Sequence, residues 1–125
     1  MDVPEDCRYT DQHEWARLEE AGVRVGITDY AQEALNEVVL VHLPEPGRRC
    51  RAGDLVAEID STKSVAEVYS PADGVILEVN AVLGERPELV NQDPYGAGWL
   101  ILLQADDLAA LDALLDAAAY RALVG

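Results

Sequence analysis

The chemistry that this chain could carry is centred on one residue, Lys63. It is the only lysine in the sequence, and every other basic residue except the two histidines is an arginine. A guanidinium stays protonated at physiological pH and is a poor nucleophile, whereas the ε-amine of lysine can lose its proton and be acylated. We interpret Lys63 as a site of amine chemistry. The alternative is a chance lysine on an exposed turn.

The residues on both sides of Lys63 are typical of a β-hairpin. β-branched residues, among them Val65 and Val68, lie in short runs, and a Ser-Pro-Ala-Asp-Gly turn at residues 70–74 ends the second run. The sequence therefore predicts a hairpin over about residues 55–74 with the lysine at its tip. A hairpin tip is exposed to large partners yet held at both ends, which suits the presentation of a modified side chain.

No other catalytic or metal-binding site is indicated. The two histidines, His13 and His42, are too few for a zinc site, and no nucleophile elbow or glycine-rich phosphate loop occurs. Cys7 and Cys50 match no metal or redox spacing, so we expect them to be reduced and structural. The expected protein is a carrier without a metal and without catalytic residues of its own.

Length and charge narrow the class of protein further. With 125 residues the chain is long enough for one domain, residues 1–125, with a single modest core. A net charge of -15 disfavours nucleic acid and anionic membranes as partners and favours proteins with basic surfaces. No apolar run approaches a membrane span, and the acidic residues 1–6 are unlike a signal peptide. We therefore expect a cytoplasmic protein of bacterial type.

Periodicity predicts a mostly β fold with short helices around the hairpin. Strands are expected over residues 9–18, 23–27, 37–43, 74–80 and 99–104. They would form a sandwich or flattened barrel.

Three helical segments are expected between and after these strands. Asp29 and Gln32 predict a capping box for a helix through Asn36, and residues 87–91 predict one helical turn. A closing helical segment is expected over about residues 106–123. Its leucine stripe should pack against the sheet: Leu108, Leu111, Leu114 and Leu115.

Short sequence words along nearly the whole chain resemble a known family. The words are Tyr9-Thr-x-x-His13-Glu14-Trp15, Val25-Gly-Ile-Thr-Asp29-Tyr-Ala-Gln32, Val38-Val-x-Val-x-Leu-Pro44, Tyr69-Ser-Pro71-x-x-Gly74, Glu78-Val-Asn80, Pro87-Glu-Leu-Val-Asn91 and Pro94-Tyr-Gly-x-Gly98-Trp99-Leu. In this order and spacing they are similar to the H protein of the glycine cleavage system. Many matched words in order are far more specific than any single motif.

The resemblance implies a barrel-sandwich hybrid fold, like that of lipoyl and biotinyl domains, with lipoic acid attached as an amide to Lys63. It also implies the partners. Glycine decarboxylase would load an aminomethyl group, a tetrahydrofolate-dependent aminomethyltransferase would remove it, and dihydrolipoamide dehydrogenase would reoxidise the arm. A lipoate-attaching enzyme would install the cofactor. The chain itself would be the shuttle and not an enzyme.

The resemblance also suggests residues for the loaded arm, and it shows one departure. Glu14 and Glu67 are candidates to hold the cationic amine of the loaded arm in a surface cleft. Members of the family commonly have Glu-Ser-Val-Lys-Ala around the modified lysine, whereas this chain has Asp60-Ser-Thr-Lys-Ser64. An H-like carrier that relays lipoyl groups or serves another complex is therefore the alternative.

Overall fold

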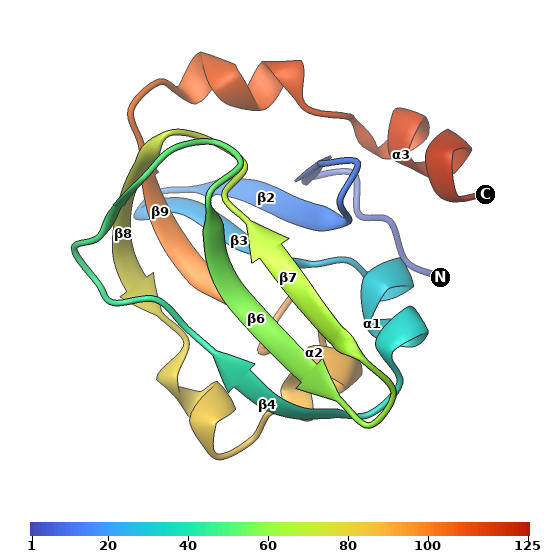
Figure 1. The fold of residues 1–125 in the computed structure, drawn as a ribbon. Helices are drawn as coiled ribbons and strands as arrows, with labels where there is room; N and C mark the ends of the chain where they lie inside the picture. The colour runs from blue at the N-terminus through green and yellow to red at the C-terminus, as the bar shows by residue number, and fades with distance from the viewer.

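In the computed structural model, which describes all 125 residues, nine strands form two antiparallel sheets (Figure 1). One sheet has six strands in the order β1-β2-β3-β9-β8-β5, and the other has three in the order β4-β6-β7. The mostly β fold is confirmed. The strands are β1 (Arg8–Tyr9), β2 (Glu14–Glu19), β3 (Gly22–Ile27), β4 (Val38–His42), β5 (Arg49–Cys50), β6 (Leu55–Ser61), β7 (Val65–Tyr69), β8 (Gly74–Val79) and β9 (Ile101–Ala105).

The hairpin formed by β6 and β7 is anchored because the side chains on one of its faces are part of the hydrophobic core. Ala57 and Ile59 of β6 and Val68 of β7 are buried, and they belong to a cluster of 20 buried residues between the sheets. Successive side chains of a strand alternate between faces, so Glu58 and Glu67 point away from this cluster. Burial of the inner row therefore fixes the strands and leaves the turn free to project.

The N-terminal strand is shorter than expected. The predicted strand over residues 9–18 is interrupted by a turn between β1 and β2, in which His13 has a φ of 68°. The hydroxyl of Thr10 accepts hydrogen bonds from the backbone N–H groups of Gln12 and Glu14, each at 3.2 Å. A threonine side chain that bonds to the backbone two residues later favours a turn over a continuous strand.

The helix α1 (Asp29–Leu35) begins with a different cap from the one expected. Thr28 is the N-cap, and its hydroxyl accepts a hydrogen bond from Ala31 N–H at 3.2 Å. Gln32 donates to the Asp29 carboxylate at 2.7 Å instead of reaching back to the backbone. The predicted capping box is therefore wrong by one residue, because threonine competes with aspartate as a cap.

The closing segment is helical in two pieces and is not one helix. The first piece is a 3-10 helix, η2 (Leu108–Ala113), with Asp107 as its N-cap. The second is α3 (Ala117–Val124), with Asp116 as its N-cap. Between them Leu115 exchanges two backbone hydrogen bonds with Tyr9, at 2.8 and 2.9 Å.

Every helix of the chain falls short of the length and hydrophobicity that a membrane span needs. The remaining helices are η1 (Ala81–Gly84) and α2 (Leu89–Gln92).

The leucine stripe expected for this segment is wrong in part. Leu111 is buried in the main core, and Leu114 packs partly buried against it. Leu115 packs against a second cluster, and Leu108 is 51% exposed. The periodic spacing fails because the chain is extended at Leu114 to pair with β1.

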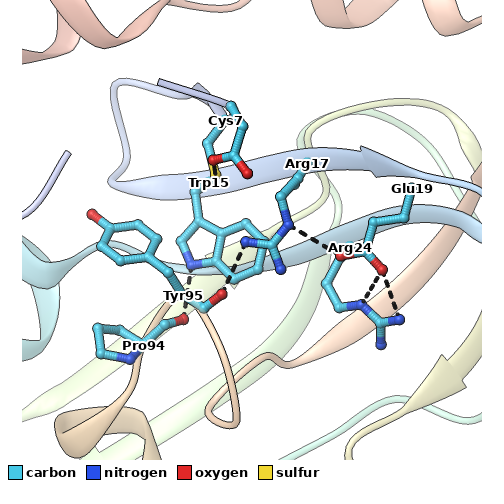
Figure 2. Close-up of polar contacts among 8 residues, drawn as sticks. Cys7, Trp15, Arg17, Glu19, Arg24, Pro94 and Tyr95 are labelled. Atoms are coloured by element: carbon cyan, nitrogen blue, oxygen red, sulfur yellow. Dashed lines mark hydrogen bonds and ion pairs between the residues drawn. The ribbon is translucent and has the colours of Figure 1, made fainter. Parts of the chain in front are cut away.

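Trp15 is the centre of the contacts that fix the start of β2 (Figure 2). Its ring is fully buried, and its indole N–H donates to the carbonyl of Pro94 at 3.0 Å. The guanidinium of Arg17 lies 4.8 Å from the ring centroid, and Arg17 shares the carboxylate of Glu19 with Arg24. These contacts tie β2 and β3 to the loop before β9 and hold the residues just before Trp15 in place.

Replacing Gly26 with alanine should destabilise the protein. The added Cβ would lie 2.7 Å from the Trp15 indole nitrogen, so the fully buried ring would have to shift. We expect the free energy of unfolding to fall by about 1–3 kcal/mol, measured by chemical denaturation. Gly84→Ala is the matched control, since nothing lies within 4 Å of its added Cβ. Equal losses in both variants would contradict this packing argument.

Candidate functional site

The turn between β6 and β7 lies at the end of the hairpin (Figure 1), and Lys63 is one of the residues of this turn, as the sequence predicts. β6 ends at Ser61 and β7 begins at Val65, and residues 62–64 are all exposed. The Lys63 ammonium takes part in none of the ion pairs of the structure, and only its backbone N–H makes a hydrogen bond. The amine is therefore accessible and is not engaged with another part of the chain.

The turn that carries Lys63 is closed by the side chain of Ser61. Its hydroxyl accepts hydrogen bonds from the N–H groups of Lys63 and Ser64, at 3.2 and 3.0 Å, and donates to the carbonyl of Ser64 at 2.9 Å. Thr62 N–H donates to the carbonyl of Glu37 beside β4 at 3.0 Å. Ser61 was not predicted as a positioning residue, although a serine at the start of a short turn is a known turn signal.

The two residues that depart from the family pattern do not build this turn. The side chains of Thr62 and Ser64 are exposed and make no hydrogen bond, whereas the contacts of the tip come from Ser61 and from the backbone. The hydrogen bonds that close the tip therefore do not involve the side chains at these two positions.

A cavity of about 650 Å³ lies at the other end of β7. Glu14 and Tyr69 line it, and the C-terminal segment contributes Leu114 and Leu115 to its wall. Glu14 therefore lines a cavity at the surface. Glu67 is not among the lining residues and points outward from the three-stranded sheet, so the structure does not bring the two candidate glutamates together.

Glu14 is buried, with 2% of its surface exposed. One carboxylate oxygen accepts a hydrogen bond from the Thr10 hydroxyl at 2.6 Å, and the other accepts one from Tyr69 N–H at 3.0 Å. Burial raises the pKa of Glu14, while these two hydrogen bonds oppose the rise. Each carboxylate oxygen therefore accepts one hydrogen bond from the protein and keeps a second acceptor site.

β7 connects the two parts of the site. Lys63 lies two residues before its first residue, Val65, and Tyr69, whose N–H donates to Glu14, is its last residue. The link between Tyr69 and Glu14 spans 55 positions and was not predicted from the sequence. Nothing in the local sequence signals it, because a backbone N–H carries no residue identity.

The other residues considered for chemistry are structural. Nδ1 of His13 lies 2.8 Å from the hydroxyl of Tyr120, which joins α3 to the turn before β2. The His13 ring also lies tilted against the ring of Tyr30, with 4.7 Å between the ring centroids. Cys7 and Cys50 are buried and unpaired with each other. Burial raises the pKa of the Cys7 thiol to about 12, so it is held as an unreactive thiol.

Replacing Glu14 with glutamine should change how stability depends on pH. Because the pKa of Glu14 is raised in the folded state, the wild type binds an extra proton on folding, and its free energy of unfolding is lowered as pH rises above roughly 4.5. Glutamine does not titrate, and its one amide oxygen can accept the hydrogen bond from Tyr69 N–H, while the hydrogen bond from the Thr10 hydroxyl is lost at every pH. Denaturation at several pH values should therefore show a stability difference, variant minus wild type, that grows as the pH rises above roughly 4.5 and levels off above the raised pKa of Glu14. A difference independent of pH would refute the assigned shift.

Comparisons with known proteins agree on one family. The family model described as glycine cleavage H-protein matches residues 7–125. The glycine cleavage system H protein of Thermus thermophilus is 53% identical over 121 residues, which cover 97% of this chain and 94% of that protein. The corresponding protein of Anaeromyxobacter sp. (strain K) is 47% identical over 124 residues, with 99% and 97% covered.

A solved structure gives the same result for the fold. The crystal structure of a glycine cleavage system H protein from Mycobacterium marinum matches with a TM-score of 0.89 at 41% identity. The match covers 98% of this chain and 99% of that one, so it includes both sheets and the C-terminal segment. Sequence and structure therefore place this chain in the glycine cleavage H-protein family.

Proposed function

We propose that this chain carries lipoic acid as an amide on Lys63 and moves an aminomethyl group between the enzymes of a glycine cleavage system. Membership of the family makes the chain a carrier and not a catalyst. The single observation that supports the attachment site is that the only lysine of the chain stands exposed and unpaired at the tip of an anchored hairpin. No other side chain offers an amine that could be acylated.

The surroundings of Lys63 fit such a group. Acylation converts an exposed ammonium into a neutral amide, and no ion pair has to be broken because the ammonium has none. When attached, lipoic acid supplies a sulfur that can accept and release the aminomethyl group. The chain's own contribution is to hold the attachment point at a fixed place on a rigid hairpin, which keeps the cargo at high effective concentration for successive enzymes.

Within this proposal, Glu14 is the group that receives the cationic amine of the cargo. Its carboxylate is buried at a cavity wall, where an attraction to a cation is less weakened by water than on an open surface. The apolar wall made by Leu114 and Leu115 would also limit access of water to the cargo. The position of Glu67 outside this cavity gives no support to the same role for that residue.

The partners that we propose are glycine decarboxylase, aminomethyltransferase, dihydrolipoamide dehydrogenase and a lipoate-attaching enzyme. The net charge of -15 would attract enzymes whose surfaces around the active site are basic. A cytoplasmic location follows from the same proposal, because the relatives named above are bacterial. The chain is proposed to act as one carrier domain over residues 1–125.

Lys63→Arg should abolish lipoylation without affecting the fold. The side chain of Lys63 makes no contact that holds the structure together, and arginine keeps the charge but is a poor nucleophile. Intact-mass spectrometry after incubation with lipoate, ATP and a lipoate-attaching enzyme should show one lipoyl group on the wild type and none on the variant. A wild-type chain that stays unmodified would refute the attachment, and a variant that still gains a lipoyl group would refute Lys63 as its site.

The same material distinguishes the two carrier functions. Lipoylated wild type should be loaded by glycine decarboxylase when glycine is present. Lipoylation without loading would favour the alternative, an H-like carrier that relays lipoyl groups or serves another complex. That alternative stays open because Thr62 and Ser64 differ from the residues that flank the modified lysine in the family pattern.

Ser61→Ala should slow lipoylation, whereas Ser64→Ala should not. Alanine at position 61 removes the hydroxyl that accepts two backbone hydrogen bonds and donates a third within the turn, while the Ser64 hydroxyl makes none. We expect the initial rate of lipoylation to fall roughly fivefold for Ser61→Ala. This factor corresponds to about 1 kcal/mol, the typical net contribution of one hydrogen bond. Equal rates for the two alanine variants would show that the conformation of the turn does not matter for attachment.

A further inference from the structure

The hydroxyl of Tyr120, in α3, makes two hydrogen bonds that the proposed function does not use. Tyr120 is fully buried, and its oxygen lies 2.8 Å from Nδ1 of His13 and 2.7 Å from the hydroxyl of Thr28. None of these three residues lines the cavity. Yet His13 directly precedes Glu14 in the chain, so the hydroxyl acts on the segment that carries the carboxylate.

The direction of these hydrogen bonds follows from the acceptors that are present. The hydroxyl oxygen of Thr28 accepts from Ala31 N–H, and Tyr120 is the one acceptor for the proton of this buried hydroxyl. The Tyr120 hydroxyl then donates to Nδ1 of His13, which must be neutral to accept. Burial lowers the pKa of His13, which agrees with a neutral ring. The three side chains thus form one directed chain of hydrogen bonds that starts at Thr28 and ends at His13.

His13 depends on this support because of its backbone conformation. Its φ of 68° lies in the left-handed region, which costs free energy for a residue with a Cβ. The turn is closed by a hydrogen bond from His13 N–H to the Thr10 carbonyl at 3.2 Å, and Thr28 N–H donates to the His13 carbonyl at 3.0 Å. Tyr120 therefore holds His13 in two ways, directly through the ring and indirectly through Thr28.

The turn that contains His13 also holds the carboxylate of Glu14. The Thr10 hydroxyl donates to one Glu14 oxygen at 2.6 Å and accepts from Glu14 N–H at 3.2 Å. Residues 10–12 line the cavity together with Glu14. If His13 left its left-handed conformation, Thr10 and Glu14 would move relative to Tyr69 N–H, the second partner of the carboxylate. The position of the carboxylate therefore depends on the conformation of His13.

Resting on the proposed role of Glu14 toward the cargo, we infer that Tyr120 is a positioning residue for this carboxylate. Its hydroxyl acts through His13 and Thr28, and it fixes the turn in the conformation that places Glu14 at the cavity wall. The ring of Tyr120 is stacked on Tyr9, with 4.6 Å between the ring centroids, which holds the hydroxyl in place. A residue near the C-terminus thus controls a group near the N-terminus.

The first test uses the unmodified chain and Tyr120→Phe, which keeps the ring on Tyr9 and removes only the hydroxyl. Amide hydrogen exchange of Tyr69, whose N–H donates to the Glu14 carboxylate, should become about fivefold faster, the factor that one lost hydrogen bond represents. The pKa of His13, followed by NMR titration of its ring, should rise toward its ordinary value because the neutral ring loses its donor. Unchanged exchange at Tyr69 would overturn the inference.

Tyr95→Phe is the matched control. The hydroxyl of Tyr95 also makes two hydrogen bonds, since it accepts from Asp29 N–H at 3.1 Å and donates to the Asp2 carbonyl at 2.8 Å. Neither bond involves the turn before β2, so exchange at Tyr69 and the pKa of His13 should stay at their wild-type values. Equal acceleration in the two variants would indicate a general loss of stability and would also overturn the inference. Thermal unfolding of both variants verifies that the fold is intact.

The second test follows the cargo after lipoylation and loading by glycine decarboxylase. When water attacks the aminomethyl carbon, the carbon–sulfur and carbon–nitrogen bonds break, and a thiol, formaldehyde and ammonium are released without any oxidation or reduction. Formaldehyde release should be about fivefold faster in Tyr120→Phe than in the wild type or in Tyr95→Phe. In a Glu14→Gln background, Tyr120→Phe should have no further effect, because the hydroxyl acts through that carboxylate. The same acceleration in that background would contradict the positioning role.

The two tests separate this inference from the function on which it rests. If the wild type is not lipoylated or not loaded, the proposed function fails, while exchange at Tyr69 still decides whether Tyr120 positions Glu14. If the wild type is loaded and releases formaldehyde as fast as Tyr120→Phe does, the proposed function stands and the positioning role is wrong.

Discussion

The alternation of side chains along β6 and β7 is the constraint on which the site depends. One row of each strand is buried in the main core, which leaves the opposite row, and the turn between the strands, in solvent. A shift of one residue in this register would bury Glu58 and Glu67 and expose Ile59. The cost of that exchange holds the hairpin in one register, and the tip lysine is presented at one place as a result.

The residues of the tip could be predicted because they depend on local signals. The runs of β-branched residues, the turn at 70–74 and the uniqueness of Lys63 are all visible within one stretch of the chain. The leucine stripe failed for the opposite reason. Its spacing fits a helix, but two backbone hydrogen bonds to Tyr9 hold Leu115 in an extended segment. A pairing between residues so far apart in sequence is not indicated by the residues around either of them.

The site around Glu14 shows the same limit. The His-Glu-Trp word marked Glu14 by resemblance, but its burial follows from contacts that no short segment contains: a hydrogen bond from Tyr69, a wall made by Leu114 and Leu115, and the fixed ring of Trp15 next to it. The cap at Thr28 illustrates a smaller ambiguity, since threonine and aspartate are neighbours there and both can cap a helix. Local rules thus identified the residues, and tertiary contacts decided their surroundings.

The pairing of Tyr9 with Leu115 has a consequence for the order in which the protein folds. It closes a loop of more than 100 residues, and contacts of such long range form late because their loop entropy must be compensated by structure that already exists. On a ribosome, Leu115 emerges only after both sheets have been synthesised. The hairpin that carries Lys63 can therefore form while the cavity around Glu14 is still open on one side, so in a nascent chain the exposed lysine would be in place before that cavity is complete.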